Sequence, residues 1–137
     1  MQRTLAIIKP DAVERRLAGA IIKRIEEEGF QIRAMRRVHL TKGQAAGFYA
    51  VHHGRPFFGS LTDFMSSGPA VVAVLEHPDA IRKWRTLMGA TDPSKADAGT
   101  LRRDLAQSIE RNATHGSDAP ETAAFEIGYF FPGIDLV

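Results

Sequence analysis

The chain has 137 residues, of which 44% are hydrophobic and 25% are charged, values typical of one globular domain. It contains no cysteine, which excludes a disulfide framework, a thiolate zinc site and a cysteine nucleophile. Its 18 Lys and Arg against 16 Asp and Glu leave a net charge of +2, too small to make nucleic acid the expected main ligand. No apolar run is long enough for a membrane span, and the first residues do not resemble a signal peptide. We therefore expect a single domain over 1–137 that works in the cytoplasm.

The first part of the chain alternates strand and helix signals. Residues 4–8 form a short apolar run that ends at Lys9, which is typical of a buried strand. Apolar residues at helical spacing over 18–25 predict a helix, and Gly29 is a plausible end for it. Between 30 and 40 the apolar residues fall mainly on even positions, which predicts a strand with one wet face.

The middle of the chain begins with a capping box. Thr41 followed by Gln44 predicts the start of a short helix that runs through Tyr49. Another short helix is expected over 60–67, followed by the most apolar strand at 69–76.

The last part contains the weakest signals. Pro78 starts a helix that Gly89 ends, and the long loop at 90–100 is of a kind that is usually functional or disordered. We expect the fourth strand within 101–110 and a last helix that begins near Pro120. The order of these elements predicts an α/β fold, a ferredoxin-like βαββαβ sandwich whose four-stranded antiparallel sheet is covered by helices on one side.

Several polar residues could carry chemistry, although each also has an ordinary explanation. The GxxxxGK[ST], GxGxxG and HExxH patterns are all missing from the sequence. Lys9 follows a predicted strand, where ligands of α/β proteins collect, but a solvated lysine at a strand end is more common. Arg85 lies in a basic run that could be a wet helix face, and Arg102 and Arg103 are equally ambiguous.

His115, in the stretch RNATHGSD, has the strongest case. Its sequence neighbours are small and offer no apolar packing, so the competing interpretation is an ordinary exposed histidine. Histidine can act as a general base, metal ligand or nucleophile, and the only other nearby-looking imidazoles, His52 and His53, have no spacing relation to it. A nucleophilic histidine needs a group that holds its tautomer, and Glu126 is a candidate, although surface glutamates are common. Residues alone therefore indicate a phosphate-handling α/β domain with one unusual histidine.

The chain resembles the nucleoside diphosphate kinases. Five segments occur in the order found in that family: TLAIIKPDAVER, FYAVHHGRPFFGSL, FMSSGPAVVAVLE, LMGATDPSKADAGTLR and ERNATHGSDAPETAAFEI. The resemblance covers about residues 3–131, and NATHGSD is close to the family signature. It implies transfer of the γ-phosphate of a nucleoside triphosphate, typically ATP, to nucleoside diphosphates by a ping-pong reaction through a phosphohistidine. Such a reaction maintains the NTP and dNTP pools.

The resemblance also implies a role for each matching residue. His115 matches the phosphohistidine, and Glu126 and Ser117 match the groups that orient its ring. The residues that match nucleotide-binding positions are Lys9, Tyr49, Phe57, Leu61, Arg85, Thr91, Arg102, Ile109 and Asn112. Among them, Phe57 and Ile109 match an apolar clamp on the base, which accounts for broad specificity because every base has a face to stack on. The implied cofactor is Mg²⁺, which would arrive on the nucleotide phosphates with Asp118 as a neighbour through water at most.

The resemblance also concerns the oligomeric state, and the sequence departs from the family pattern at a few positions. The resemblance implies a homo-oligomer, either a hexamer or a tetramer built from a common dimer, and the short end IDLV is similar to the bacterial form. Asp92 stands where Asn is common, and Arg103 and Leu105 replace a small and an aromatic residue, which puts only local packing and subunit contacts in doubt.

Two other functions are weighed against the enzyme. A nucleotide- or nucleic-acid-binding module that had kept the fold would be expected to lack His115 or a phosphate-binding residue. A structural or regulatory oligomer with basic patches would be expected to work without His115.

Overall fold

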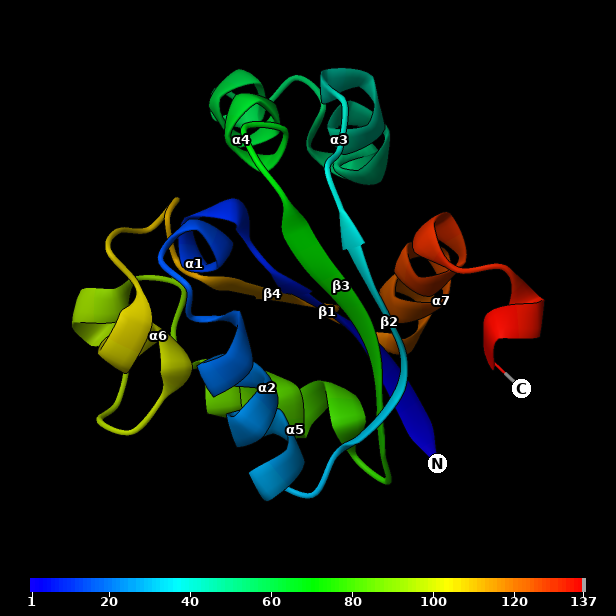
Figure 1. Cartoon of the computed structure of the whole chain (residues 1–137). Coiled ribbons are helices and arrows are strands. Elements are labelled where there is room, and N and C mark those ends of the chain that lie inside the picture. Colours follow the sequence, from blue (N-terminus) through cyan, green and yellow to red (C-terminus); the bar gives the residue numbers. More distant parts are fainter. Residues whose placement is uncertain (137) are drawn as a thin grey trace.

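The computed structural model describes residues 1–136, and its centre is a four-stranded antiparallel sheet (Figure 1). The strands lie in the order β2-β3-β1-β4. Their bounds are β1 Gln2–Ile8, β2 Gln31–Val38, β3 Ala70–His77 and β4 Thr114–Gly116. This order, with helices between the strands, is that of a ferredoxin-like sandwich. The predicted fold class is confirmed.

Helices cover both faces of the sheet, so the expectation of helices on one side is wrong. One face packs against α1 Pro10–Glu14, α2 Ala18–Glu27, α5 Ala80–Met88 and α6 Leu101–Leu105. The other face packs against α3 Lys42–Phe48, α4 Phe58–Met65 and α7 Pro120–Phe130. Short 3₁₀ turns occur at η1 Ala50–His52, η2 Pro93–Lys95 and η3 Gly133–Leu136. The reason is that β1 and β3 are apolar on both sides: Leu5 and Ile7 belong to one core, Ala6 and Ile8 to the other.

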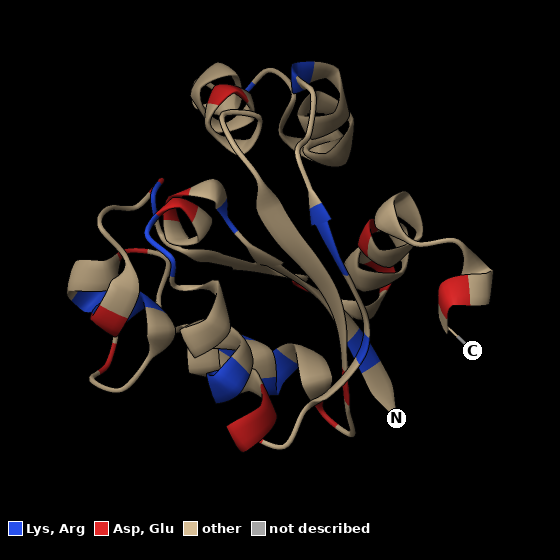
Figure 2. Ribbon diagram, in the orientation of Figure 1, with Lys and Arg blue, Asp and Glu red and all other residues tan. Residues whose placement is uncertain are grey.

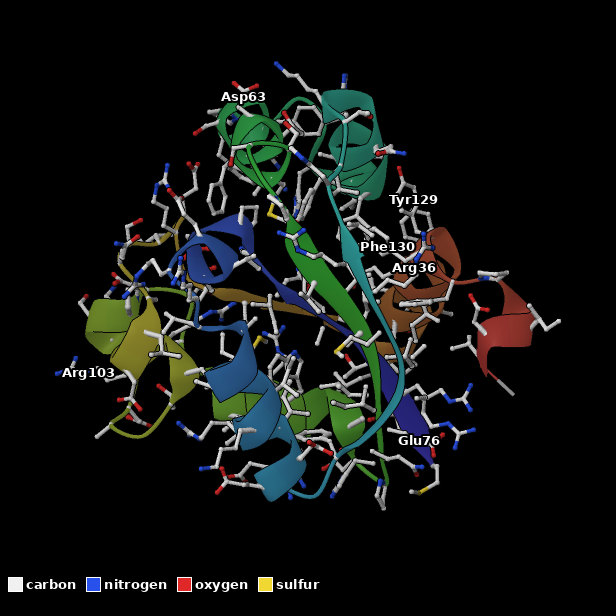
Figure 3. The ribbon with its side chains drawn as sticks, viewed as in Figure 1. Arg36, Asp63, Glu76, Arg103, Tyr129 and Phe130 are labelled. Carbon is white, nitrogen blue, oxygen red and sulfur yellow. The ribbon has the colours of Figure 1, made fainter. Side chains whose placement is uncertain are left out.

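The edge strand β2 has solvent-exposed side chains, as its alternating pattern predicts, but its pairing with β3 is irregular at one point. A bulge shifts its register against β3 between Ile32 and Ala34. As a result Ile32 packs in one core, whereas Ala34 and Val38 pack in the other. Arg36 of β2 donates a hydrogen bond from Nη1 to the carbonyl of Phe130 at 3.0 Å, which ties this edge strand to α7 (Figure 3).

The fourth strand does not lie within 101–110. Residues 101–105 form α6, in which Leu101 and the partly buried Leu105 turn toward one core at i, i+4 spacing. The strand is instead β4, whose three residues pair with β1. A strand of three residues is too short to produce an alternation signal, so only its pairing reveals it. Helix α1, which begins at Pro10, was also not expected.

The capping box is confirmed. Thr41 Oγ1 accepts a hydrogen bond from the Gln44 amide at 3.0 Å, and Gln44 Oε1 accepts one from the Thr41 amide at 2.9 Å. Within residues 1–136, no helix has the length and apolar character needed to cross a membrane. Charged residues of both signs are interspersed over the helices and loops (Figure 2).

Candidate active site

Two adjoining cavities lie beside the end of β1 and the start of β4. One has a volume of about 440 Å³ and contains Arg85, Arg102 and Asp118 in its lining, and the other has a volume of about 470 Å³ and is mostly apolar. Both are lined by Lys9, Tyr49, Thr91, Asn112 and His115. The structure thus brings together residues that are as much as 109 positions apart, from Lys9 to Asp118.

His115 is the middle residue of β4 and lies opposite Ile7 of β1. Its Nε2 lies 2.9 Å from Glu126 Oε1, and both side chains are mostly buried. Because a carboxylate accepts hydrogen bonds, this contact places the ring proton of the neutral imidazole on Nε2. The other nitrogen, Nδ1, then keeps a free lone pair on a ring that lines both cavities.

Ser117 connects this pair to the sheet. It is completely buried, and its hydroxyl donates to the same Oε1 of Glu126 at 2.8 Å. The Ser117 oxygen also accepts a hydrogen bond from the backbone amide of Leu5 at 3.1 Å. Glu126 is therefore held by two side chains at once, one of which is anchored to β1.

Aromatic side chains surround His115, although its sequence neighbours are small. The rings of Phe48 and Tyr49 lie edge-on to it, with centroids 5.4 and 6.1 Å from its own. Trp84 Nε1 donates a hydrogen bond to the His115 carbonyl at 3.0 Å. The small sequence neighbours of His115 gave no sign of this packing, because the contacts come from α3, from Tyr49 at its end and from α5.

Gly116 allows this close packing. A Cβ at this position would lie 2.6 Å from Trp84 Cδ1 and 2.6 Å from Met88 Cε, closer than real Cβ atoms come to such neighbours. The glycine therefore lets α5 approach the strand that carries His115.

Lys9 is buried at the junction of the two cavities. Its Nζ donates to Asn112 Oδ1 at 2.8 Å. Burial, followed by the positive charge of Arg102, lowers the pKa of Lys9 to about 8, while the negative charges of Asp11 and Glu110 act in the opposite direction. The ammonium is thus poorly compensated by the protein alone, which suits a group that receives an anionic ligand.

Arg102 and Arg85 supply two further cations. Arg102 is buried on α6, where its guanidinium donates to the carbonyls of Gly89 at 3.0 Å and Thr114 at 2.9 Å. Burial, followed by the charge of Arg85, lowers the pKa of Arg102 to about 10, so that it remains charged at neutral pH. Arg85 of α5 is paired with Asp118 at the rim of the cavity.

Arg103 points away from the site, although it follows Arg102 directly. Both residues lie within 101–110, where a strand was expected, but this segment is α6, and Arg103 lies at its outer surface (Figure 3). There Arg103 Nη1 donates to the carbonyl of Ser94 at 3.2 Å. Asp92, another departure from the family pattern, caps η2 by accepting hydrogen bonds from the Ser94 amide and hydroxyl at 2.9 and 2.8 Å.

Tyr49 is buried against both cavities. Its hydroxyl has no hydrogen-bond partner within residues 1–136. Burial, together with the negative charge of Glu126, raises the pKa of Tyr49, so the phenol keeps its proton and can donate to a ligand.

The apolar cavity opens between two segments that carry exposed hydrophobic side chains. Phe57, which precedes α4, is 47% exposed, and Ile109 of the 106–113 loop is 59% exposed. Both line the cavity with Leu61. Ser60 donates to Glu110 Oε2 at 2.7 Å, and this hydrogen bond joins α4 to the loop. A flat ring could fit between the two segments.

Two residues at the site were not assigned by the sequence. His52 lines the cationic cavity and stacks on Tyr49 with ring centroids 6.3 Å apart. His52 follows Tyr49 by three residues on a 3₁₀ turn, and this spacing places both side chains on the same side of the chain. That spacing could have indicated His52 from the sequence. Asp11 is 2% exposed and contacts the backbone of Ala113, next to Asn112. In the described part of the chain, no group of three or more His, Asp or Glu is arranged to hold a metal.

A family model described as nucleoside diphosphate kinase matches residues 2–136. The chain belongs to this family. A nucleoside diphosphate kinase of Syntrophotalea carbinolica is 64% identical to it over 137 residues, which are the whole of both chains. One of Desulfosudis oleivorans is 62% identical over all of this chain and 99% of that protein. The crystal structure of the Aquifex aeolicus nucleoside diphosphate kinase has a TM-score of 0.97 and 45% identity, covering 99% of each chain.

Membership of this family makes the chain a phosphotransferase that acts on nucleotides. The enzyme that the resemblance implied is therefore confirmed, in preference to the binding-module and structural alternatives.

Proposed function

We propose that His115 carries the phosphoryl group between the two nucleotides in a ping-pong reaction. Its Nδ1 attacks the γ-phosphorus of a nucleoside triphosphate, a nitrogen–phosphorus bond forms, and the bond from phosphorus to the bridging oxygen breaks to release the diphosphate. A terminal oxygen of an acceptor diphosphate then attacks the phosphohistidine and restores the neutral ring. The observation that carries this proposal is the hydrogen bond between His115 Nε2 and Glu126, because it leaves Nδ1 as the nucleophile.

Glu126 and Ser117 are proposed to orient His115 and to stabilise its charge. The imidazole becomes more cationic as Nδ1 bonds to phosphorus, and a carboxylate on Nε2 favours that change. Ser117 supports the carboxylate by donating to the same oxygen. Glu126 already contacts both His115 and Ser117 in this structure, so the proposed role requires no rearrangement of these side chains.

The nucleotide is proposed to extend through both cavities. The phosphates and ribose would contact a set of donors at the cationic end: Lys9, Tyr49, Arg85, Thr91, Arg102 and Asn112. Phosphoryl transfer depends mainly on positioning and on stabilising charge on the phosphate oxygens, which fixed donors from several elements provide. The base would lie between Phe57 and Ile109, beside Leu61.

Mg²⁺ bound to the nucleotide fits the donors of this site. The lining of the cationic cavity includes one carboxylate, that of Asp118, which is mostly exposed. A cation that keeps several waters and binds mainly phosphate oxygens suits such a site. When bound, Mg²⁺ supplies neutralising charge to the phosphates, and Asp118 would contact it through water.

We further propose that the enzyme is a homo-oligomer, a hexamer or a tetramer built from dimers, and that it acts in the cytoplasm, where its nucleotide substrates are. Two features of the edge strand β2 support association. Met35 exposes an apolar side chain there, and an edge strand offers unpaired backbone groups to a neighbouring chain. Light scattering of the purified protein tests the assembly.

The phosphohistidine is tested by incubating the protein with Mg²⁺ and γ-labelled ATP without an acceptor, followed by a denaturing gel. A labelled band that survives alkali, is lost in mild acid and is discharged by GDP to give GTP is expected. The His115→Ala variant should give no band. An unlabelled wild-type protein that still binds nucleotide would contradict the proposal.

A further inference from the structure

Three backbone and side-chain contacts join the start of α1 to the turn that precedes His115. The Lys9 amide donates to the Ala113 carbonyl at 2.8 Å, and the Ala113 amide donates to Asp11 Oδ2 at 3.1 Å. Lys9 Nζ donates to Asn112 Oδ1. The segment 9–11 therefore contacts both backbone groups of Ala113 and the side chain of Asn112.

Ala113 has an unusual backbone conformation. Its φ is +72°, in the left-handed region that residues with a Cβ adopt at a cost in free energy. The Thr114 amide donates to the Asn112 carbonyl at 2.9 Å, which closes a three-residue turn around Ala113. A turn of this kind persists only where its surroundings hold it.

Asp11 is well placed to hold this turn. Its side chain is 2% exposed, and one oxygen accepts the Ala113 amide while the other, Oδ1, has no hydrogen-bond partner within residues 1–136. A buried carboxylate requires compensation by hydrogen bonds or by a nearby cation. Lys9 is that cation: the negative charge of Asp11 favours the protonated form of Lys9 against burial and against the charge of Arg102.

We propose that Asp11 is a positioning residue for phosphoryl transfer, whose carboxylate holds the turn at Ala113 and thereby directs the Lys9 ammonium and the Asn112 amide toward the nucleotide. The same contacts lie directly before β4, which starts at Thr114, one residue before His115. This inference rests on the proposed function, in which Lys9 and Asn112 bind the phosphates and ribose.

The contacts divide the role of Asp11 into a geometric and an electrostatic part. The geometric part is the hydrogen bond to Ala113, which a neutral amide oxygen can also accept. The electrostatic part is the effect on Lys9, whose other charged neighbours are Arg102 of α6 and Glu110 of the 106–113 loop. A residue that only stabilised the fold would contribute to neither KM nor its pH dependence.

The first test is Asp11→Asn, which keeps the shape and an acceptor oxygen but removes the charge. Steady-state kinetics with ATP and GDP should show a KM raised by about tenfold, which corresponds to the loss of one charge-assisted contact. The fall of kcat/KM at alkaline pH should begin at lower pH than in the wild type, because Lys9 loses its proton more readily. Glu14→Gln removes the same charge from an exposed position on the same helix and should match the wild type.

The second test separates the strain from the charge. Glycine adopts positive φ freely, so adding Ala113→Gly to Asp11→Ala should recover much of the melting temperature that Asp11→Ala loses. The displaced pH profile should remain in the double variant, because the charge is still absent.

Two results would overturn the proposal. One is an Asp11→Asn variant with wild-type KM and pH profile and a lower melting temperature, which would make Asp11 purely structural. The other is a Glu14→Gln variant that changes the profile equally. A wild-type protein that forms no phosphohistidine is a different outcome, which contradicts the proposed function instead.

Discussion

His115 and Glu126 are in direct contact, Nε2 to Oε1 at 2.9 Å, although they belong to different elements, β4 and α7. The contact exists because α7 packs against β1, the neighbour of β4 in the sheet. The side of α7 that carries Glu126 then lies next to β4. A carboxylate in this position determines which ring nitrogen is free. The orientation of the nucleophile is therefore a property of how α7 is packed.

Replacing Glu126 with Gln should slow phosphorylation of His115 by about 10²-fold, because the charge that favours a cationic ring is lost. The KM for nucleotide should change little, since Glu126 contacts the ring and not the cavity. Single-turnover formation of the phosphohistidine from labelled ATP measures the effect. Glu121→Gln, at an exposed position on the same helix, is the matched control, and an equal loss in this variant would contradict the assignment.

Replacing Gly116 with Ala should lower the free energy of unfolding by about 1–3 kcal/mol, because the new methyl group would overlap Trp84 and Met88. Activity should fall as well, since Trp84 is hydrogen-bonded to the His115 carbonyl. Urea denaturation measures the stability. Gly128→Ala on α7, where a Cβ meets nothing within 4 Å, should instead raise stability by about 0.5–1 kcal/mol. Equal effects at the two glycines would argue against the packing explanation.

Replacing Phe57 with Ala should raise the KM about tenfold for ADP, GDP, CDP and UDP alike, because stacking on a ring does not read the edge of the base. The maximal rate should be nearly unchanged. Phe125→Ala removes another exposed phenylalanine, 55% exposed on α7, which does not line either cavity, and it should leave each KM as it is. A KM that rose for one base only would show that Phe57 selects between bases.

The pH dependence of kcat/KM should reflect Lys9. Its pKa of about 8 means that the ammonium is present below that pH and is lost as the pH rises through it. The free enzyme should accordingly bind nucleotide less well above about pH 8, and kcat/KM reports the free enzyme. Lys9→Met should have low activity with no further decline in this interval. The same decline in the variant would assign it to another group.

The fold could be predicted largely from local patterns. The apolar run 69–76, the capping box at Thr41 and the stop at Gly89 each act over a few residues, and the structure has a strand, a helix start and a helix end at these places. The sequence misplaces β4 and does not predict α6, because three residues of strand and five of helix are too few to show a repeated alternating or helical pattern. The second helical layer is not evident from the sequence for a related reason, since the short apolar run of β1 does not show which helices cover each of its two faces.

For the site, the sequence by itself determined which residue types are present and in what order, and through family resemblance it named most of the side chains that line the two cavities. It could not determine what surrounds each of them. The aromatic rings around His115, the approach of Trp84 to Gly116 and the hydrogen bond of Asp11 to Ala113 join residues that are between 32 and 102 positions apart. Such contacts arise only when separate elements pack together, and hydrogen bonds and steric overlap depend on distances of a few tenths of an ångström that no local pattern encodes.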